Sequence, residues 1–356
     1  MNPPKPPEFF EPTLPEDEFR DRLLVLNRQT YSSPEFAFDA VTTHVYRPPA
    51  PYAQVDHSFF HDGEIWHFFY NAFDVEKESS YLECVAAGDW DGAARNSIER
   101  GMGHAVGASL LELEYKELIE PPVEGRHDML LRSNGWVFPH DGRYGMLYGV
   151  RGRDGFVGFS LMWSDDLASW KSSGSNPVLQ APGWAMPGST CKDVHLVHHR
   201  GVWLIYTITA EDADTICMAL ASTVDWNTFA DHGCVFRACP MLRGTRGLES
   251  PAVILRDGMW HLFITWGFGV WHAVGRSPCS FSGIYYLGPF HAAEVIEDPS
   301  GEWWFTTDRK EEWRRRNRVE GKRCFRGSYE DDRVLYEGLY LSRIHWEADQ
   351  PILGKP

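Results

Sequence analysis

The chain has 356 residues, of which 43% are hydrophobic, 14% aromatic and 24% charged, with 32 glycines and 23 prolines, a composition typical of a folded globular protein. Its 34 Lys and Arg residues against 50 Asp and Glu residues give a formal net charge of −16, which repels nucleic-acid phosphates and anionic lipid headgroups. We therefore expect no nucleic acid and no membrane among its partners.

The sequence also lacks the features of an exported protein. No apolar stretch approaches the roughly 18 residues of a membrane span, and the N-terminal segment MNPPKPPEFFEPTLPEDEF has neither a basic start nor an apolar core. The seven cysteines are scattered, odd in number and without a CxxC pair, which predicts reduced thiols. We expect a cytoplasmic protein.

Residues 1–50 are rich in proline and lack the repeat that follows, so we expect an N-terminal extension, either a closing strand or a lid. From residue 51 onward one pattern recurs five times: an apolar strand, a tight turn that ends in glycine, and an aromatic-rich strand. Glycine supplies the positive φ that tight hairpin turns need, so each copy predicts a β-hairpin. The turn glycines are Gly63, Gly142, Gly201, Gly258 and Gly301.

A second pattern, an apolar pair followed by Ser, a polar turn and Trp, follows most of these hairpins, as in MWSDDLASWK from Met162 and YLSRIHWEAD from Tyr340. One hairpin with a further strand pair makes a four-stranded sheet. Four-stranded sheets repeated around an axis are the blades of a β-propeller, for which five is an ordinary number. We therefore predict an all-β fold, a single five-bladed β-propeller of antiparallel blades over residues 51–350. A β-sandwich is the alternative, but it offers no reason for the hairpin signature to recur in register.

The residues that open the five hairpins are Asp56, Asn134, Asp193, Glu249 and His291. In a propeller the first strand of every blade lines the central channel, so we expect these five positions to be neighbours at one end of it. A carboxylate buried there without partners would be costly, so three acids in a channel indicate a function.

Three converging carboxyl groups cannot all ionise independently, because like charges in one pocket raise at least one pKa. Glycoside hydrolysis requires one protonated and one ionised carboxyl group. The acid protonates the departing oxygen, and the carboxylate activates water or attacks the anomeric carbon. The sequence therefore favours a glycosidase with Asp56, Asp193 and Glu249 as catalytic candidates.

These residues resemble the five-bladed propeller glycosidases of glycoside hydrolase family 43 and the related family 32. Asp56, Asp193 within KDVHLV, and Glu249 within ESP match in blade order the three acids of family 43, whereas blade two offers only Asn134 where family 32 has an acid. HAAEVIEDPSGEWW and SDDLASW also look like segments of these families. VDHSFF replaces the usual Asp-Pro in blade one, and the WMNDPNG motif of family 32 is absent, so the subfamily is open.

The resemblance implies a role for each acid. Glu249 would donate a proton to the departing sugar oxygen, Asp56 would deprotonate the attacking water, and Asp193 would orient Glu249 and raise its pKa. The reaction would invert the anomeric configuration, with about 6.5 to 9.5 Å between the carboxyl groups of base and acid. The substrate would be an oligosaccharide or glycoside, such as a furanoside or a xyloside.

Sugar recognition needs flat aromatic faces and planar polar groups. The candidates near the inner strand ends are His57, Asn134, Trp136, His195, Trp266, Trp271, His291 and Arg309. The resemblance implies no required cofactor, but His291 could help to hold a structural calcium ion.

Two alternatives stay open. A glycoside phosphorylase on the same fold would need cations at the funnel, for which Arg132, Arg151, Arg153 and Arg309 are candidates. A non-catalytic carbohydrate-binding propeller would use the acids to bind hydroxyls or a metal without chemistry. The basic insertion between Arg309 and Arg326 is more typical of a solvated loop or helix than of an anion site.

Overall fold

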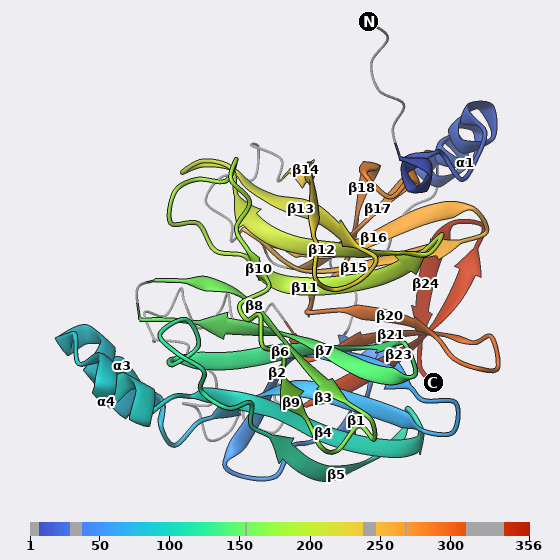
Figure 1. Cartoon of the computed structure of the whole chain (residues 1–356). Coiled ribbons are helices and arrows are strands. Elements are labelled where there is room, and N and C mark those ends of the chain that lie inside the picture. Colours follow the sequence, from blue (N-terminus) through green and yellow to red (C-terminus); the bar gives the residue numbers. More distant parts are fainter. Residues whose placement is uncertain (1–6, 29–37, 154, 238–246, 268, 311–337) are drawn as a thin grey trace, which may run out of the picture.

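Five antiparallel sheets surround a common axis in the computed structural model, which describes residues 7–28, 38–153, 155–237, 247–267, 269–310 and 338–356 (Figure 1). The arrangement is an all-β, five-bladed β-propeller, as the repeated hairpins predict. Each of the five hairpins supplies the two inner strands of one blade. Most of the basic insertion lies outside the described residues.

The strands of each blade run outward from the axis in chain order, apart from the closing strands of blade five. Blade one contains β2 (Tyr52–His61), β3 (Trp66–Asp74), β4 (Glu99–Ser109) and β5 (Glu112–Ile119). Blade two contains β6 (Leu131–His140), β7 (Arg143–Arg151), β8 (Val157–Ser164), β9 (Lys171–Ser172) and β10 (Leu179–Gln180). Blade three contains β11 (Lys192–His199), β12 (Val202–Ala210), β13 (Ile216–Thr223) and β14 (Ala230–Arg237). Blade four contains β15 (Leu248–Arg256), β16 (Met259–Trp266), β17 (Gly269–Ser277) and β18 (Ser280–Gly288).

Blade five joins the two ends of the chain. Its inner strands β20 (Glu294–Glu297) and β21 (Trp303–Thr307) pair in order with β23 (Leu339–Glu347). The outer position is shared by β1 (Thr43–Tyr46), from the N-terminal extension, and β24 (Gln350–Gly354). The propeller sheet thus extends beyond both of the expected boundaries, residues 51 and 350. A separate short pair, β19 (Phe290–His291) and β22 (Arg309–Lys310), continues from blade five.

Local turn chemistry explains the hairpins. The five predicted turn glycines all have a positive φ, between 76° and 107°. In three blades the residue before the glycine, Asp141, Arg200 or Asp257, also has a positive φ, which is the signature of a type I′ turn. This turn type matches the right-handed twist of the flanking strands, so the sequence of the turn sets the hairpin register.

The N-terminal extension forms a closing strand and an outer helical segment. Besides β1, it contains the short helix η1 (Glu8–Phe10), helix α1 (Glu16–Arg28) and helix α2 (Phe38–Val41). Leu14 and Leu26 from the η1–α1 region pack with Met259 and Val274 of blade four. Arg22 forms an ion pair with Asp349, so α1 also bridges to blade five.

Two further helices interrupt blade one. Helices α3 (Glu78–Ala87) and α4 (Trp90–Arg95) lie between β3 and β4 and project beyond the sheets (Figure 1). Tyr81 and Ala93 of these helices pack with Val55 and Phe73. Because Val55 directly precedes Asp56, this helical insertion is anchored at the end of blade one that carries the first candidate acid.

The described residues show neither a membrane helix nor a disulfide. Within the ranges given above, no helix is long and apolar enough to cross a bilayer. The five cysteines in those ranges, Cys84, Cys191, Cys217, Cys234 and Cys279, are free thiols.

Candidate active site

An irregularity recurs in the inner strands where the candidate acids lie. The register between the first two strands shifts between Val55 and His57 in blade one and between Lys192 and His195 in blade three. The residues at these bulges, Asp56 and Asp193, have φ values of 39° and 56°. A positive φ is strained for a residue other than glycine, and such bulges re-aim a side chain out of the regular alternation of the strand.

Blade four has the same bulge, between Glu249 and Pro251, and blade five has a residue with positive φ just before its inner strand. Ser250 has a φ of 47° and Ala292 a φ of 49°, so these two residues correspond to Asp56 and Asp193. Glu249 and His291 each lie one residue earlier in the chain. We expected the five residues that open the hairpins to occupy equivalent strand positions. In blades four and five this prediction is wrong by one residue. The side chain of Glu249 therefore enters the site from a different backbone position than those of Asp56 and Asp193.

Ser250 connects the first two acids. Its hydroxyl donates to Oδ1 of Asp56 at 3.1 Å, and its backbone N–H donates to Oδ2 of Asp193 at 3.3 Å. The ammonium of Lys192 lies 3.0 Å from Oδ2 of Asp193 and 3.5 Å from Oε1 of Glu249. The structure therefore brings Asp56, Asp193 and Glu249 from blades one, three and four into one network.

Two carboxyl groups of this network are shielded from solvent, whereas the side chain of Lys192 is 36% exposed. The side chain of Asp193 is 8% exposed and that of Glu249 is 24% exposed. Burial raises the pKa of Asp193; Lys192 opposes this rise, and the negative charges of Asp56 and Glu249 add to it. Burial alone would lower the pKa of Lys192, but its two carboxylate neighbours more than offset this, so its pKa is raised and it stays charged.

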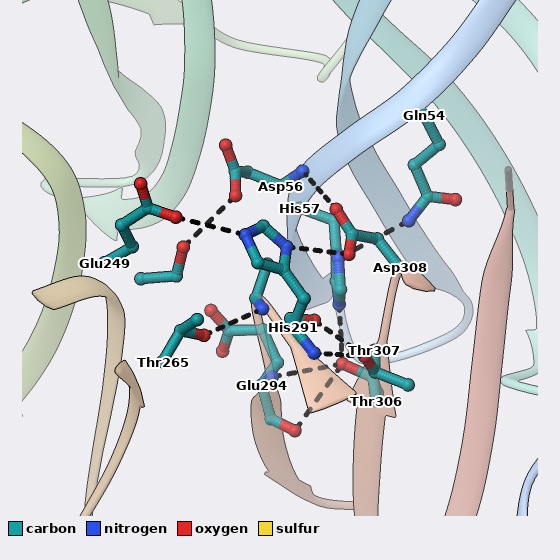
Figure 2. Close-up of polar contacts among 12 residues, drawn as sticks. Gln54, Asp56, His57, Glu249, Thr265, His291, Glu294, Thr306, Thr307 and Asp308 are labelled. Carbon is teal, nitrogen blue, oxygen red and sulfur yellow. Dashed lines mark hydrogen bonds and ion pairs between the residues drawn. The ribbon is translucent and has the colours of Figure 1, made fainter. Parts of the chain in front are cut away.

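A buried imidazole and carboxylate connect the acids of blades one and four (Figure 2). Asp308 is fully buried; its Oδ1 lies 2.9 Å from Nδ1 of His291, and its Oδ2 accepts the backbone N–H of Asp56 at 3.1 Å. Nε2 of His291 lies 3.3 Å from Oε2 of Glu249. Thr307 donates its hydroxyl to the carbonyl of His291 at 2.6 Å. The position of His291 is thus held at both its backbone and its ring.

A pocket with an empty volume of about 410 Å³, its open mouth included, lies beside these acids. Inner-strand residues of all five blades line it, including Asp56, His57, Trp136, Asp193, Ser250 and Glu294. Glu249 does not line this pocket itself, but the next residue does. Burial lowers the pKa of His57 to about 4, so this ring is neutral near pH 7; its Nε2 lies 2.6 Å from the hydroxyl of Thr306.

The remaining substrate-binding candidates are placed differently. Trp136 lines the pocket and packs edge-on against the buried ring of His195, with 4.5 Å between ring centroids. Trp266 is 2% exposed in the hydrophobic core, and Trp271 packs on it and donates its indole N–H to the Trp266 carbonyl. Neither lines the pocket: Trp266 belongs to a core cluster shared by blades three and four, and Trp271 is a partly buried residue packed against it. These two assignments are therefore corrected to core packing.

Two candidates are described only by their backbones. Asn134 lies in β6 and Arg309 in β22, and their side chains are outside the described part of the chain. Of the cations considered for a phosphorylase, Arg132 is buried and donates to the backbone carbonyl of Asp128, whereas Arg151 and Arg153 are exposed. None of these three arginines lines the pocket.

Sequence reasoning missed four side chains of this region: Lys192, Ser250, Asp308 and Glu294. Lys192 and Ser250 each adjoin a predicted acid, so a strand bulge next to the acid would have been the signal for them. Asp308 directly follows the second strand of blade five in the run TTDRK. No local pattern marks a single acid at that place, because its partners come from distant parts of the chain.

The donor set can be compared with the needs of a metal ion. One atom from each of Asp56, His291 and Asp308 lies within 4.8 Å of the others, a spacing that could hold a cation. Calcium prefers six to eight oxygen ligands, and this set supplies one imidazole and two carboxylates. Both oxygens of Asp308 are also in contact with N–H groups of the protein. The described residues therefore fit calcium poorly.

Comparisons with known proteins bear on the fold. No protein-family model and no curated protein sequence matches the chain. Among solved structures, it is similar to a family 32 β-fructofuranosidase from Bombyx mori, with a TM-score of 0.63 and 12% identity over 96% of this chain and 70% of that one. It is similar to a sucrose-6-phosphate hydrolase from Lactobacillus gasseri, with a TM-score of 0.62 and 13% identity over 94% and 66%. It is also similar to a thermostable family 43 glycoside hydrolase, with a TM-score of 0.61 and 14% identity over 88% and 96%. The chain thus has the five-bladed propeller fold of family 32 and family 43 glycoside hydrolases.

Proposed function

We propose that this protein is a glycoside hydrolase that cleaves a glycosidic bond with inversion of the anomeric configuration. The observation that carries the proposal is the network of three carboxyl groups, from blades one, three and four, beside a pocket that Asp56 and Asp193 line. A structural neighbour, a mutant β-fructofuranosidase from Bombyx mori, is described in complex with sucrose, which supports a carbohydrate substrate.

Glu249 is the proposed general acid. Nδ1 of His291 faces Asp308, so the neutral tautomer with its proton on Nδ1 presents an unprotonated Nε2 to Glu249. A hydrogen bond between Nε2 and Glu249 then requires the proton to be on the carboxyl group. The contact favours the protonated state that the acid needs before it transfers this proton to the departing sugar oxygen.

Asp56 is the proposed general base. Its backbone N–H is bound by Asp308 and its carboxylate accepts the Ser250 hydroxyl, so both its backbone and its side chain are oriented. The carboxylate removes a proton from the water that attacks the anomeric carbon. The water oxygen forms the new bond, the glycosidic bond breaks, and the leaving oxygen takes its proton from Glu249.

Asp193 and Lys192 are proposed to adjust the electrostatic environment of Glu249. Lys192 contacts both Asp193 and Glu249, so it compensates the negative charge that forms on Glu249 after proton transfer. Asp193 in turn holds the ammonium at 3.0 Å and keeps it from forming a fixed ion pair with Glu249 alone. We propose furanosides or xylosides as the substrate class.

The proposal is tested with a panel of aryl furanosides and aryl xylosides, in buffers with and without phosphate. We expect hydrolysis at the same rate in both buffers, and the first product seen by proton NMR to have the inverted configuration. Glu249→Gln and Asp56→Asn should each lower kcat by about 10² to 10⁴, while Glu297→Gln, an exposed change on β20, should leave it unchanged. Turnover that depends on phosphate would support the phosphorylase instead, and Glu249→Gln with more than about a tenth of wild-type turnover would refute the acid role.

A further inference from the structure

A second set of side chains lies on the inner strands, two residues further along the chain than the positive-φ residues. Side chains two residues apart lie on the same face of a strand. Two residues after the positive-φ positions Asp56, Asp193 and Ala292 come Ser58, His195 and Glu294, and all three of these are more than nine-tenths buried; the corresponding position of blade four holds the apolar Ala252. Ser58 and Glu294 line the pocket, so buried polar side chains border it besides Asp56 and Asp193.

The ring of His195 has a defined orientation and one unused nitrogen. Its Nε2 lies 2.8 Å from the carbonyl oxygen of Val253, which can only accept, so Nε2 carries a proton. In the neutral ring Nδ1 is then an acceptor, and this buried atom has no hydrogen-bond partner. Trp136 packs against the ring at 4.5 Å between centroids, which prevents it from turning toward another partner.

Glu294 is the group that Nδ1 faces. Its Oε1 lies 3.8 Å from Nδ1, beyond hydrogen-bond distance. Burial is the main influence on this carboxyl and raises its pKa, with His195 acting in the opposite direction. Within the described ranges, no Lys or Arg nitrogen lies within ion-pair distance of it. Among the described residues the Glu294 carboxyl thus has no Lys or Arg to neutralise it, and the neighbouring Nδ1 of His195 is an acceptor with no donor. Together these two features indicate that the carboxyl group of Glu294 keeps its proton.

Neither group has a part in the proton transfers proposed above. Figure 2 shows Glu294 on the strand that follows His291, with its carboxyl group pointing away from Thr306 and Thr307. The backbone N–H of Glu294 is bound by Thr306, so the strand that carries the carboxyl is itself held in place. The side chain therefore faces the pocket from a fixed backbone.

We propose that Glu294, positioned by His195, is a specificity-determining residue that recognises one hydroxyl group of the sugar ring bound in the pocket. This deepens the proposed function and rests on it for the identity of the ligand as a sugar. One carboxyl oxygen carries the proton and faces Nδ1 of His195 at 3.8 Å, and the other accepts a hydrogen bond from the ligand hydroxyl. A ligand that lacks this hydroxyl leaves a buried acceptor unsatisfied, which is how a polar site rejects a close analogue.

The experiment is a cycle of direct binding measurements by calorimetry. The probes are xylose, arabinose and fructose, followed by the monodeoxy forms of the sugar that binds best. In the wild type, one monodeoxy form should bind about tenfold to a hundredfold more weakly than its parent. In Glu294→Leu the affinity for the parent sugar should fall by the same factor. The affinities for the parent sugar and for its monodeoxy form should then be equal.

The conservative variant separates recognition from folding. In Glu294→Gln the amide NH₂ faces Nδ1 of His195 and the amide oxygen still accepts from the ligand, so the discrimination should stay within about threefold of the wild type. Glu297→Gln, on the exposed side of the same strand, is the matched control and should change nothing. If Glu294→Leu does not fold, Glu294→Met provides the apolar member of the cycle.

The outcomes distinguish this inference from the proposed function. If the sugar discrimination depends on Glu294 but no glycoside is hydrolysed, the hydrolase proposal fails and the recognition site stands. If glycosides are hydrolysed but the apolar variant distinguishes the parent sugar from its monodeoxy form as the wild type does, the role of Glu294 is refuted and the hydrolase proposal stands. Absence of binding of all three sugars to the wild type would also overturn the inference.

Discussion

Replacing Asp308 by asparagine removes one negative charge from between the proposed base and the proposed acid while it preserves size and shape. Both oxygens of Asp308 contact N–H groups, one from the His291 ring at 2.9 Å and one from the Asp56 backbone at 3.1 Å. Asparagine offers one oxygen and one NH₂ group. If its oxygen keeps the Asp56 N–H, its NH₂ faces the ring of His291, which must then move its own proton to Nε2.

The tautomer change acts on Glu249. A protonated Nε2 donates to the carboxylate instead of accepting from the carboxylic acid, so it favours the state that cannot act as an acid. A hydrogen bond to a charged group contributes about 1.5 to 3 kcal/mol. At about 1.4 kcal/mol for each factor of ten, kcat should fall by roughly tenfold to 150-fold.

The assay compares two leaving groups. Alkyl glycosides need protonation of the departing oxygen, whereas dinitrophenyl glycosides hardly need it, so Asp308→Asn should slow the alkyl substrates much more. Asp298→Asn is the control in the same blade: Asp298 accepts from the Trp304 indole at 2.9 Å and from Ser300 at 2.6 Å in the hairpin turn at the opposite end. This control should lower Tm and leave kcat unchanged. An equal loss on both leaving groups, or a kcat within threefold of wild type on the alkyl substrate, would refute the tautomer argument.

Three further outcomes are expected. Lys192→Met removes the cation that contacts Asp193 and Glu249, so the alkaline limb of the kcat/KM profile should move up by about one pH unit; an unchanged limb would mean that Lys192 does not influence the acid. Burial lowers the pKa of His57 to about 4 and the pKa values of His104 and His261 to about 3. Below about pH 6.5 these histidines therefore bind protons in the unfolded chain but stay neutral in the folded protein. The free energy of unfolding should therefore fall between pH 7 and pH 5, by up to about 1.4 kcal/mol per pH unit for each such histidine, in urea titrations, and His104→Gln should flatten the slope. Dialysis against EDTA should leave activity unchanged because the donor set at His291 fits calcium poorly, and a loss that calcium restores would contradict this.

The sequence by itself determined the blades and the identity of the acids. A glycine with positive φ and a residue such as Asp257 before it specify a hairpin through contacts within a few residues, so these signals could be followed directly along the chain. The acids could be found because carboxyl groups at the inner ends of apolar strands conflict with simple packing. The location of Asp56, Asp193 and Glu249 on inner strands follows from these two facts, but the one-residue offset of Glu249 does not.

Only the tertiary structure decided how these acids are held. Asp308 binds the backbone of Asp56 across 252 residues of chain, and Ser250 reaches Asp56 across 194. The bulges that re-aim the acids, and the packing that places Trp266 in the core and Glu294 in the pocket, depend on which strands become neighbours. Turn geometry and strand alternation are local properties of a sequence, whereas hydrogen-bond partners across the axis exist only after all five blades have closed.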